Sequence, residues 1–358
     1  MELASLRIAG LRLFERLDIA FEPGWNLLVG ANGAGKTTIL EAAYLLSHGR
    51  SFRAGSRDVL VREGSAGFSI YGEFVAADIR RGLGIGRQNG RVEARVDGQA
   101  TTLGDLMRYA AVSCFEPGSH DLLSGASEGR RRFLDWGVFH VEHDFLGTWM
   151  RYQRAQRQRN ALLRRGASDS ELEPWAHELA RSGEPLSAMR QRYFAALASA
   201  AEPLLAELLP ELGSPRLEFS AGHDTGQSLF EELLARQARD RERGHGTRGP
   251  HRADWSLAFE RAPRREHLSR GQEKLSAFAM VMAQAVRYAA SHGDMPVLCL
   301  DDLASEVDVE HLGRVLAMVE RSGAQVLATA TERVAAFDRL RRPPAMFHVE
   351  QGQARRLL

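Results

Sequence analysis

The stretch from residue 30 to residue 38 constrains this chain most, because it follows an apolar run, Trp25–Val29, that predicts a strand. It fits the pattern G-x-x-x-x-G-K-T, and a helix is expected from Thr38 to about Leu46. A strand, a glycine-rich turn and a helix in this order are typical of a loop whose N–H groups converge on phosphate oxygens. The alternative, a flexible glycine-rich turn, is disfavoured by this setting. The predicted nucleotide-binding residues are Gly30, Ala31, Asn32, Gly33, Ala34, Gly35, Lys36, Thr37 and Thr38.

Two of these residues have distinct expected roles. Lys36 would hold the terminal phosphates as a point charge, and the Thr37 hydroxyl would ligate Mg2+. The chain has 47 basic residues, and only Lys36 and Lys274 among them are lysines. Because arginine is used everywhere else, lysine at position 36 indicates a phosphate-binding role rather than background usage.

Length and charge set broad limits. The 358 residues could form two or three compact units, and the formal net charge of +1 excludes a globally basic protein. Nucleic-acid binding would therefore depend on local patches. Cys114 and Cys299 lie in apolar runs, which predicts buried thiols in a reducing compartment. We find no signal peptide and no apolar run near the roughly 20 residues that cross a bilayer, so a cytoplasmic protein is expected.

The predicted elements indicate an α/β fold with a mostly parallel sheet built from both chain ends. Residues 118 to about 241 read as largely helical, and Asn89-Gly90 predicts a hairpin turn. The strand-like runs that precede the helical stretch are Leu3–Ile8, Leu11–Phe21, Trp25–Val29, Gly67–Ala76 and Leu83–Val96. The later elements are a helix from Ser269 to about Ala290, a strand Val297–Leu300, a helix Val309–Glu320, and strands at Gln325–Ala328 and Met346–Glu350.

A second motif, Leu268–Lys274, opens the helix expected from Ser269. Ser269 and Gln272 fit the S-x-x-Q capping box, and capping alone would explain both residues. Gly271 is different, because glycine in a first helical turn costs stability unless something must approach closely. A polarised helix end with a free hydroxyl suits a terminal phosphate, so Ser269, Gly271 and Gln272 are candidate nucleotide contacts.

A third motif is the apolar strand Val297–Leu300, which ends in Asp301 and Asp302. In a P-loop protein the first carboxylate is expected in the Mg2+ shell, and the second is expected to orient or deprotonate the attacking water. Alone, such a pair often only caps the next element. With the other two motifs in chain order, it predicts ATP hydrolysis with Lys36, Ser269 and Asp302 as catalytic residues.

This trio resembles the heads of ABC-type ATPases, with a Walker A motif, a signature reading LSRGQ instead of LSGGQ, and a Walker B motif leading into a D-loop at Ser305–Asp308. About 230 residues separate Lys36 from the signature, which favours the SMC-like branch that manages chromosomes over the transporter ATPases. Within that branch the chain closely resembles the RecF family of DNA replication and repair proteins. The matching stretches are Gly30–Thr38, Gly49–Arg53, Ser127–Asp135, Gly249–Arg252, Leu268–Lys274 and Asp301–Glu306.

The resemblance implies an ATP-gated clamp that uses ATP and Mg2+. Such proteins dimerise head to head with ATP, bind duplex and single-stranded DNA near gaps, and act with RecR- and RecO-type proteins to help load recombinase in repair, replication restart and the SOS response. One chain supplies one P-loop and one capped glycine helix, so two chains are needed if both contact the same ATP. The implied parts are an ATPase head at 1–117 and 244–358, with an inserted helical arm at 118–243.

Three positions depart from the usual ABC pattern. Asp302 stands where a glutamate is usual, and its shorter side chain predicts slow hydrolysis that serves a switch. Thr329-Ala330-Thr331 occupies the place of the switch histidine, so that contact with the γ-phosphate is not predicted. Phe115-Glu116-Pro117 occupies roughly the slot of the Q-loop.

The helix expected from about Glu142 to Arg165 carries Arg151, Arg154 and Arg157 off its apolar face. Residues 130–165 hold nine arginines and three acidic residues, whereas 168–232 hold twelve acidic residues and four arginines. An arginine-bearing helix is usually a solvated surface; the alternative is a salt-sensitive, sequence-independent contact with DNA phosphates. Arg130–Arg132 would support the nucleotide site or the dimer seam. No motif for base-specific readout is present. The apolar face comprises Phe145, Trp149, Tyr152, Ala155 and Leu163.

Two other functions remain open from the sequence. The ATPase subunit of a transporter or of another ABC-type complex would need a shorter insert or a different partner. A P-loop kinase would not need the LSRGQ helix, and its ATP use would depend on a second substrate. DNA-stimulated, dimer-dependent ATPase activity separates the clamp from both.

Overall fold

The computed structural model describes residues 1–53, 57–88 and 90–357, and the chain divides into two compact units. The first comprises Met1–His120 and Ser269–Leu358, and the second comprises Asp121–Leu268. The sequence predicts an inserted arm at 118–243, whereas the second unit extends to Leu268. No helix formed by the described residues is both long enough and apolar enough to span a bilayer.

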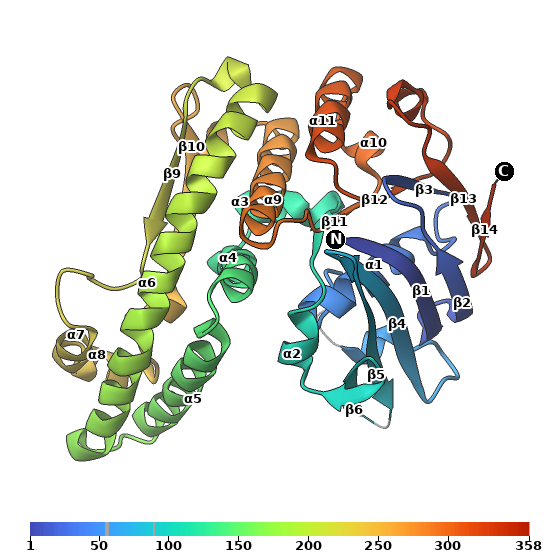
Figure 1. The fold of residues 1–358 in the computed structure, drawn as a ribbon. Helices are drawn as coiled ribbons and strands as arrows, with labels where there is room; N and C mark the ends of the chain where they lie inside the picture. Colours follow the sequence, from blue (N-terminus) through green and yellow to red (C-terminus); the bar gives the residue numbers. More distant parts are fainter. Residues whose placement is uncertain (54–56, 89, 358) are drawn as a thin grey trace. The chain divides into compact units, whose positions relative to one another are not determined.

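The first unit contains the mostly parallel sheet, which confirms the expected α/β fold (Figure 1). Every neighbouring pair is parallel except the edge pair β13–β14. Strands β11 and β12 are buried along their whole length, as expected when helices cover both faces. In order across the sheet the strands are β14 (Gln353–Arg356), β13 (Ala345–Glu350), β3 (Trp25–Val29), β12 (Val326–Ala330), β11 (Val297–Leu300) and β8 (Val112–Phe115). The helices of this part are α1 (Lys36–His48), α9 (Arg270–His292), α10 (Leu303–Glu306) and α11 (Val309–Ser322).

A second, antiparallel sheet in the same unit packs against α1, which contacts strands of both sheets. The predicted run Leu11–Phe21 is not one strand: Leu11 ends β1, Arg12 turns the chain with a left-handed φ of 49°, and β2 begins at Phe14. The Asn89 of the predicted hairpin lies outside the described residues, and the flanking strands pair antiparallel with Gln88 opposite Arg91. The strand order is β2 (Phe14–Ala20), β1 (Glu2–Leu11), β4 (Gly67–Ala76), β5 (Ile79–Gln88), β6 (Arg91–Val96) and β7 (Gln99–Thr101), and α2 (Leu103–Met107) follows.

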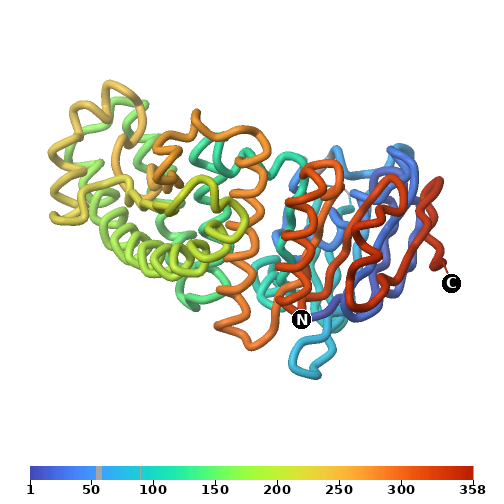
Figure 2. Tube along the Cα trace, turned by 90° about the horizontal axis from the view of Figure 1, so that it is seen from above, coloured from blue at the N-terminus to red at the C-terminus, as the bar shows by residue number. Residues whose placement is uncertain are grey.

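The N-terminal and C-terminal segments of this unit lie side by side in both views (Figures 1 and 2). Strand β3 pairs with β12 and β13, so hydrogen bonds join the two segments although they are far apart in the sequence. A head assembled from both chain ends therefore brings the P-loop, which follows β3, next to the carboxylates that follow β11.

The second unit is mainly helical, as the sequence predicts, but it also contains a strand that the sequence interpretation missed. Residues within the predicted helical stretch form strand β9 (Pro215–Ser220), which pairs antiparallel with β10 (Asp254–Phe259). Its side chains alternate between half-buried and exposed, the two-residue period of a strand, and Phe219 packs against Phe194 of α6. The helices are α3 (Asp121–Ser124), α4 (Ser127–Val141), α5 (Phe145–Arg164), α6 (Asp169–Leu208), α7 (Leu229–Ala235) and α8 (Gln237–Arg243).

Candidate nucleotide-binding site

The glycines of the P-loop are required by its backbone and by close neighbours. Gly33 and Gly35 have φ values of 82° and 112°, which residues with a Cβ rarely adopt. A Cβ at Gly30 would lie 2.1 Å from the carbonyl oxygen of Val349 on β13. The loop therefore turns tightly between β3 and α1 and presents the first turn of α1 to a ligand.

A pocket of about 590 Å3 lies over this loop, at the carboxyl ends of β3, β11 and β12. Ligands of open α/β sheets bind at that edge. The predicted residues that line it are Asn32, Gly33, Gly35, Lys36, Thr37, Thr38, Asp301 and Asp302. The other lining residues are Arg12, Leu13, Phe52, Arg53, Glu116, Pro117, Thr329 and Thr331.

Lys36 is held in place by the carbonyls of its own loop. Its Nζ donates to the carbonyl oxygens of Gly30 and Ala31, at 2.6 and 3.0 Å. Burial lowers the pKa of Lys36, and the charges of Asp302 and Asp301 oppose that shift. A phosphate in the pocket would offer this desolvated ammonium group stronger, charged acceptors.

Thr37 and Asp301, the two residues expected to ligate Mg2+, are hydrogen-bonded to each other. The Asp301 Oδ1 accepts hydrogen bonds from the hydroxyls of Thr37 and Thr329, at 2.9 and 2.8 Å. Burial raises the pKa of Asp301, although both hydrogen bonds lower it. A buried carboxylate that is costly to ionise, next to a hydroxyl oxygen, fits a hard cation whose remaining ligands are water and phosphate. The residues present therefore fit Mg2+.

Asp302 adopts a strained backbone conformation, with φ 52° and ψ 35°. Its N–H donates to the Thr329 hydroxyl at 2.9 Å, and its Oδ1 accepts from the Ser305 hydroxyl at 2.9 Å. Thr329 thus contacts both aspartates. From the sequence, Thr329 is notable only because it lies where a histidine is usual. Its hydrogen bonds to Asp301 and Asp302 are seen only in the structure.

Glu41 connects three segments around the pocket, and the sequence analysis missed it. It is fully buried on α1, accepts from Arg12 Nη2 at 2.8 Å, and accepts a hydrogen bond from Ser51. The hydrogen bond that Arg12 donates to the Glu41 carboxylate raises the pKa of Arg12. The turn at Arg12 and the loop leading to Arg53 are therefore fixed to the P-loop helix. The resemblance includes the run Gly49–Arg53, but no local pattern indicates that Arg12 joins it.

The signature residues Ser269, Gly271 and Gln272 do not line this pocket. The predicted capping box is confirmed: the Gln272 N–H donates to Ser269 Oγ at 3.3 Å, and the Ser269 N–H donates to Gln272 Oε1 at 3.0 Å. A Cβ at Gly271 would meet only Ser269 Oγ, at 3.9 Å. Packing within the chain therefore does not require glycine at this position.

The arginines proposed for DNA differ in their surroundings. Arg151, Arg154 and Arg157 are exposed on α5, and Arg151 forms an ion pair with Glu178 of α6 at 2.9 Å. Arg130 and Arg131 instead bind within their own unit, to the Asp254 carboxylate and the Ala253 carbonyl oxygen. These two contacts attach α4 to the start of β10.

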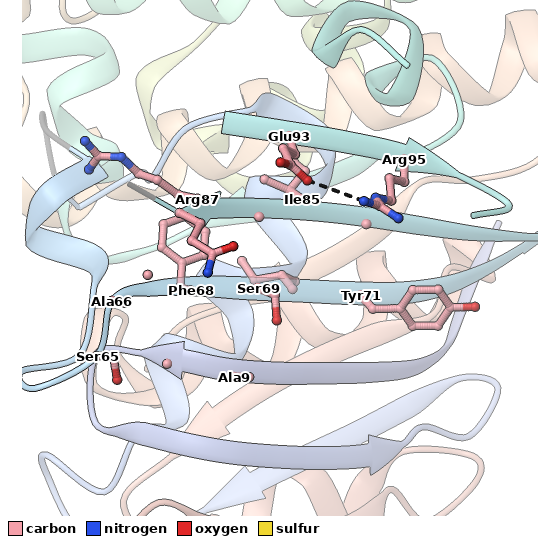
Figure 3. A pocket seen from close by; sticks show the side chains of 16 residues that line it. Ala9, Ser65, Ala66, Phe68, Ser69, Tyr71, Ile85, Arg87, Glu93 and Arg95 are labelled. Atoms are coloured by element: carbon pink, nitrogen blue, oxygen red, sulfur yellow. Dashed lines mark hydrogen bonds and ion pairs between the residues drawn. The ribbon is translucent and has the colours of Figure 1, made fainter. Parts of the chain in front are cut away.

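A second hollow, of about 580 Å3, lies on the outer face of the antiparallel sheet (Figure 3). Its lining includes Gly84 and Gly86 of β5 and Tyr71 of β4. Its Glu93 and Arg95 form an ion pair at 3.5 Å. None of the predicted site residues lines this hollow.

Sequence comparisons place the chain among known proteins. Residues 2–355 match the model of the RecF/RecN/SMC N terminal domain family. The chain is 47% identical to the DNA replication and repair protein RecF of Stenotrophomonas maltophilia, over 99% of both chains. It is 44% identical to the RecF of Xanthomonas axonopodis pv. citri, again over 99% of both.

Solved structures show the same fold. A recombination mediator protein RecF–ATPrS of the RecFOR pathway superposes with a TM-score of 0.89 at 23% identity, covering 100% of this chain and 98% of the other. An SMC head bound to the C-winged helix domain of ScpA gives a TM-score of 0.61 at 16% identity, covering 100% and 97%. The chain therefore shares the fold of these two structures over its whole length.

Proposed function

Because the chain belongs to the RecF family of DNA replication and repair proteins, we propose that it is an ATP-dependent DNA-binding clamp of recombinational repair and replication restart. ATP binding joins two heads on DNA near single-strand gaps in the cytoplasm and assists recombinase loading, and slow hydrolysis resets the clamp. The observation that carries the proposal is the convergence of Lys36, Thr37, Asp301 and Asp302 on one pocket.

Each of these residues has a role in the proposed cycle. Lys36 and the N–H groups of the P-loop bind the phosphates, and Thr37 and Asp301 hold Mg2+, which neutralises charge on the phosphates when bound. Asp302 orients the attacking water. Its side chain is one methylene shorter than glutamate and is already hydrogen-bonded to Ser305, so hydrolysis is expected to be slow.

The exposed signature supports a dimer. Ser269 and Gly271 lie at the start of a 23-residue helix, outside the pocket of their own chain. In a symmetric pair the same residues can complete the partner's pocket, because each chain supplies one P-loop pocket and one signature helix.

DNA and protein partners form the last part of the proposal. Exposed Arg154 and Arg157 provide a phosphate contact without base readout on duplex or gapped DNA. The RecF–ATPrS structure is described as part of the RecFOR pathway, and on that kinship we propose RecR- and RecO-type proteins as partners.

Sedimentation velocity with ATP and Mg2+, with and without gapped duplex DNA, tests the clamp. The wild type is expected to dimerise only with ATP and to co-sediment with DNA. Lys36→Met is expected to lose nucleotide binding, and Ser269→Arg is expected to bind ATP and stay monomeric. Ser228 also caps a helix, α7 in the other unit, so Ser228→Arg is a matched control for loss of a cap.

The same experiment separates the alternatives. A wild type that binds ATP as a monomer and ignores DNA would contradict the clamp and favour a P-loop kinase. ATP-dependent dimers that bind no DNA would instead favour the ATPase subunit of another ABC-type complex.

A further inference from the structure

Lys274 is the only lysine outside the P-loop, whereas the other basic residues of the chain are arginines. Its Nζ forms an ion pair with a Glu306 carboxylate oxygen at 2.6 Å. The two side chains are 23% and 14% exposed, so the pair is largely shielded from water. A compact ammonium on a flexible stem suits this site better than the wide, planar fork of an arginine.

The pair connects two segments with different proposed roles. Lys274 lies five residues after the cap Ser269, near the start of α9. Glu306 is the last residue of α10, and the preceding residue, Ser305, donates its hydroxyl to the Asp302 carboxylate at 2.9 Å. Contacts therefore run without a gap from the signature helix through Glu306 and Ser305 to Asp302.

The segment that the pair holds is not stable by itself. Helix α10 has four residues, far fewer than an isolated helix needs, and no side chain caps its start. The residue that precedes α10, Asp302, has a left-handed backbone conformation that surrounding contacts must maintain. The ion pair fixes the far end of this short helix, and Thr329 fixes the near end through the Asp302 N–H.

We propose that Lys274 and Glu306 are positioning residues that couple the start of the signature helix to the orientation of Asp302. The inference rests on the proposed ATP-dependent dimer and adds a mechanism to it. When the partner's nucleotide docks at Ser269 and Gly271, the shift of α9 passes through the ion pair to α10 and sets the carboxylate for hydrolysis. Dimerisation and hydrolysis are thereby linked within one chain.

A double-mutant cycle on the full chain tests this coupling. Lys274→Met, Glu306→Gln and the double variant keep side-chain volume while removing charge. Three quantities are measured: ATP affinity of the monomer, self-association with ATP, and turnover of the ATP-saturated dimer. Arg314→Met breaks an ion pair of similar length, 2.6 Å to Glu310, on the solvated face of α11 and serves as the matched control.

Each single variant is expected to bind ATP like the wild type and to hydrolyse it about tenfold more slowly. The double variant is expected to be no slower than either single one, because all three lack the same contact. The control, Arg314→Met, is expected to match the wild type in all three quantities. Thermal melting of each variant checks that it is folded.

Three outcomes would overturn the coupling while leaving the clamp intact. The first is unchanged turnover in Lys274→Met, and the second is a double variant whose loss of turnover is the product of the two single losses. The third is an equal loss of ATP affinity and turnover, which would indicate a purely structural ion pair. A wild type that neither self-associates nor hydrolyses ATP would overturn the proposed function, and the coupling with it.

Discussion

Replacing Gly271 with alanine should separate the stability of the monomer from the affinity of the dimer. Apart from the adjacent residues and the backbone of its own helix, the one described atom within 4 Å of a Cβ here is Ser269 Oγ, at 3.9 Å, so the folded chain has room for it. Glycine in a helix is about 1 kcal/mol less favourable than alanine. We therefore expect Gly271→Ala to raise the free energy of unfolding of the nucleotide-free chain by up to about 1 kcal/mol.

The dimer should respond in the opposite direction. If the partner's phosphate approaches Gly271 closely, an added methyl group costs about 1–3 kcal/mol, as overpacking does in protein cores. A symmetric dimer contains two such sites, which gives a cost of about 2–6 kcal/mol. The dissociation constant of the ATP-bound dimer should therefore rise between about 30-fold and about 10⁴-fold.

Urea unfolding without nucleotide and sedimentation equilibrium with ATP measure the two effects. Gly147 lies in the first turn of α5, with open space around a Cβ, so Gly147→Ala is the matched control that should gain stability without affecting the dimer. Dimers of Gly271→Ala as tight as those of the wild type would refute the close approach. A less stable monomer would refute the reasoning from open space.

Three further predictions concern buried or catalytic carboxylates. Asp302→Asn should keep ATP binding and slow hydrolysis by about 10²-fold or more, measured as phosphate release. Asp301→Asn should abolish Mg2+-dependent ATP binding in titration calorimetry yet stabilise the nucleotide-free chain by about 1 kcal/mol, since asparagine can still accept from Thr37 and Thr329. Because burial raises the pKa of Asp301, its contribution to stability is present below its unfolded pKa and is lost as pH rises through the folded pKa. This part of the pH dependence should be absent from thermal melts of Asp301→Asn. Finally, Asp240→Ala should destabilise the second unit by about 3–5 kcal/mol in urea unfolding, because Arg159, 1% exposed, loses its partner at 2.8 Å.

Much of the pocket could be predicted because its signals are short-range. The P-loop, its strand and its helix lie within one run of the sequence, and the capping box at Ser269 spans four residues. The buried strand β11 was predicted with its observed bounds, since a continuous apolar run ending in carboxylates indicates both its burial and its end.

Other features depend on contacts between residues far apart in sequence. Arg159 interrupts the apolar face predicted for α5, where Phe145, Tyr152, Ala155 and Leu163 are indeed buried. Its burial is made possible by its pairing with the distant Asp240 of α8. Strand β9 exists because β10 lies beside it.

By itself, the sequence determined that this protein has a nucleotide-binding α/β head, because the backbone turns, caps and apolar runs that define it are local. Only the tertiary structure decided that Thr329 contacts both aspartates, that Glu41 binds Arg12 and Ser51, and that Lys274 meets Glu306. The physical reason is that hydrogen bonds and ion pairs are set by distance in space, and no local pattern records which distant side chains the folded chain brings within reach.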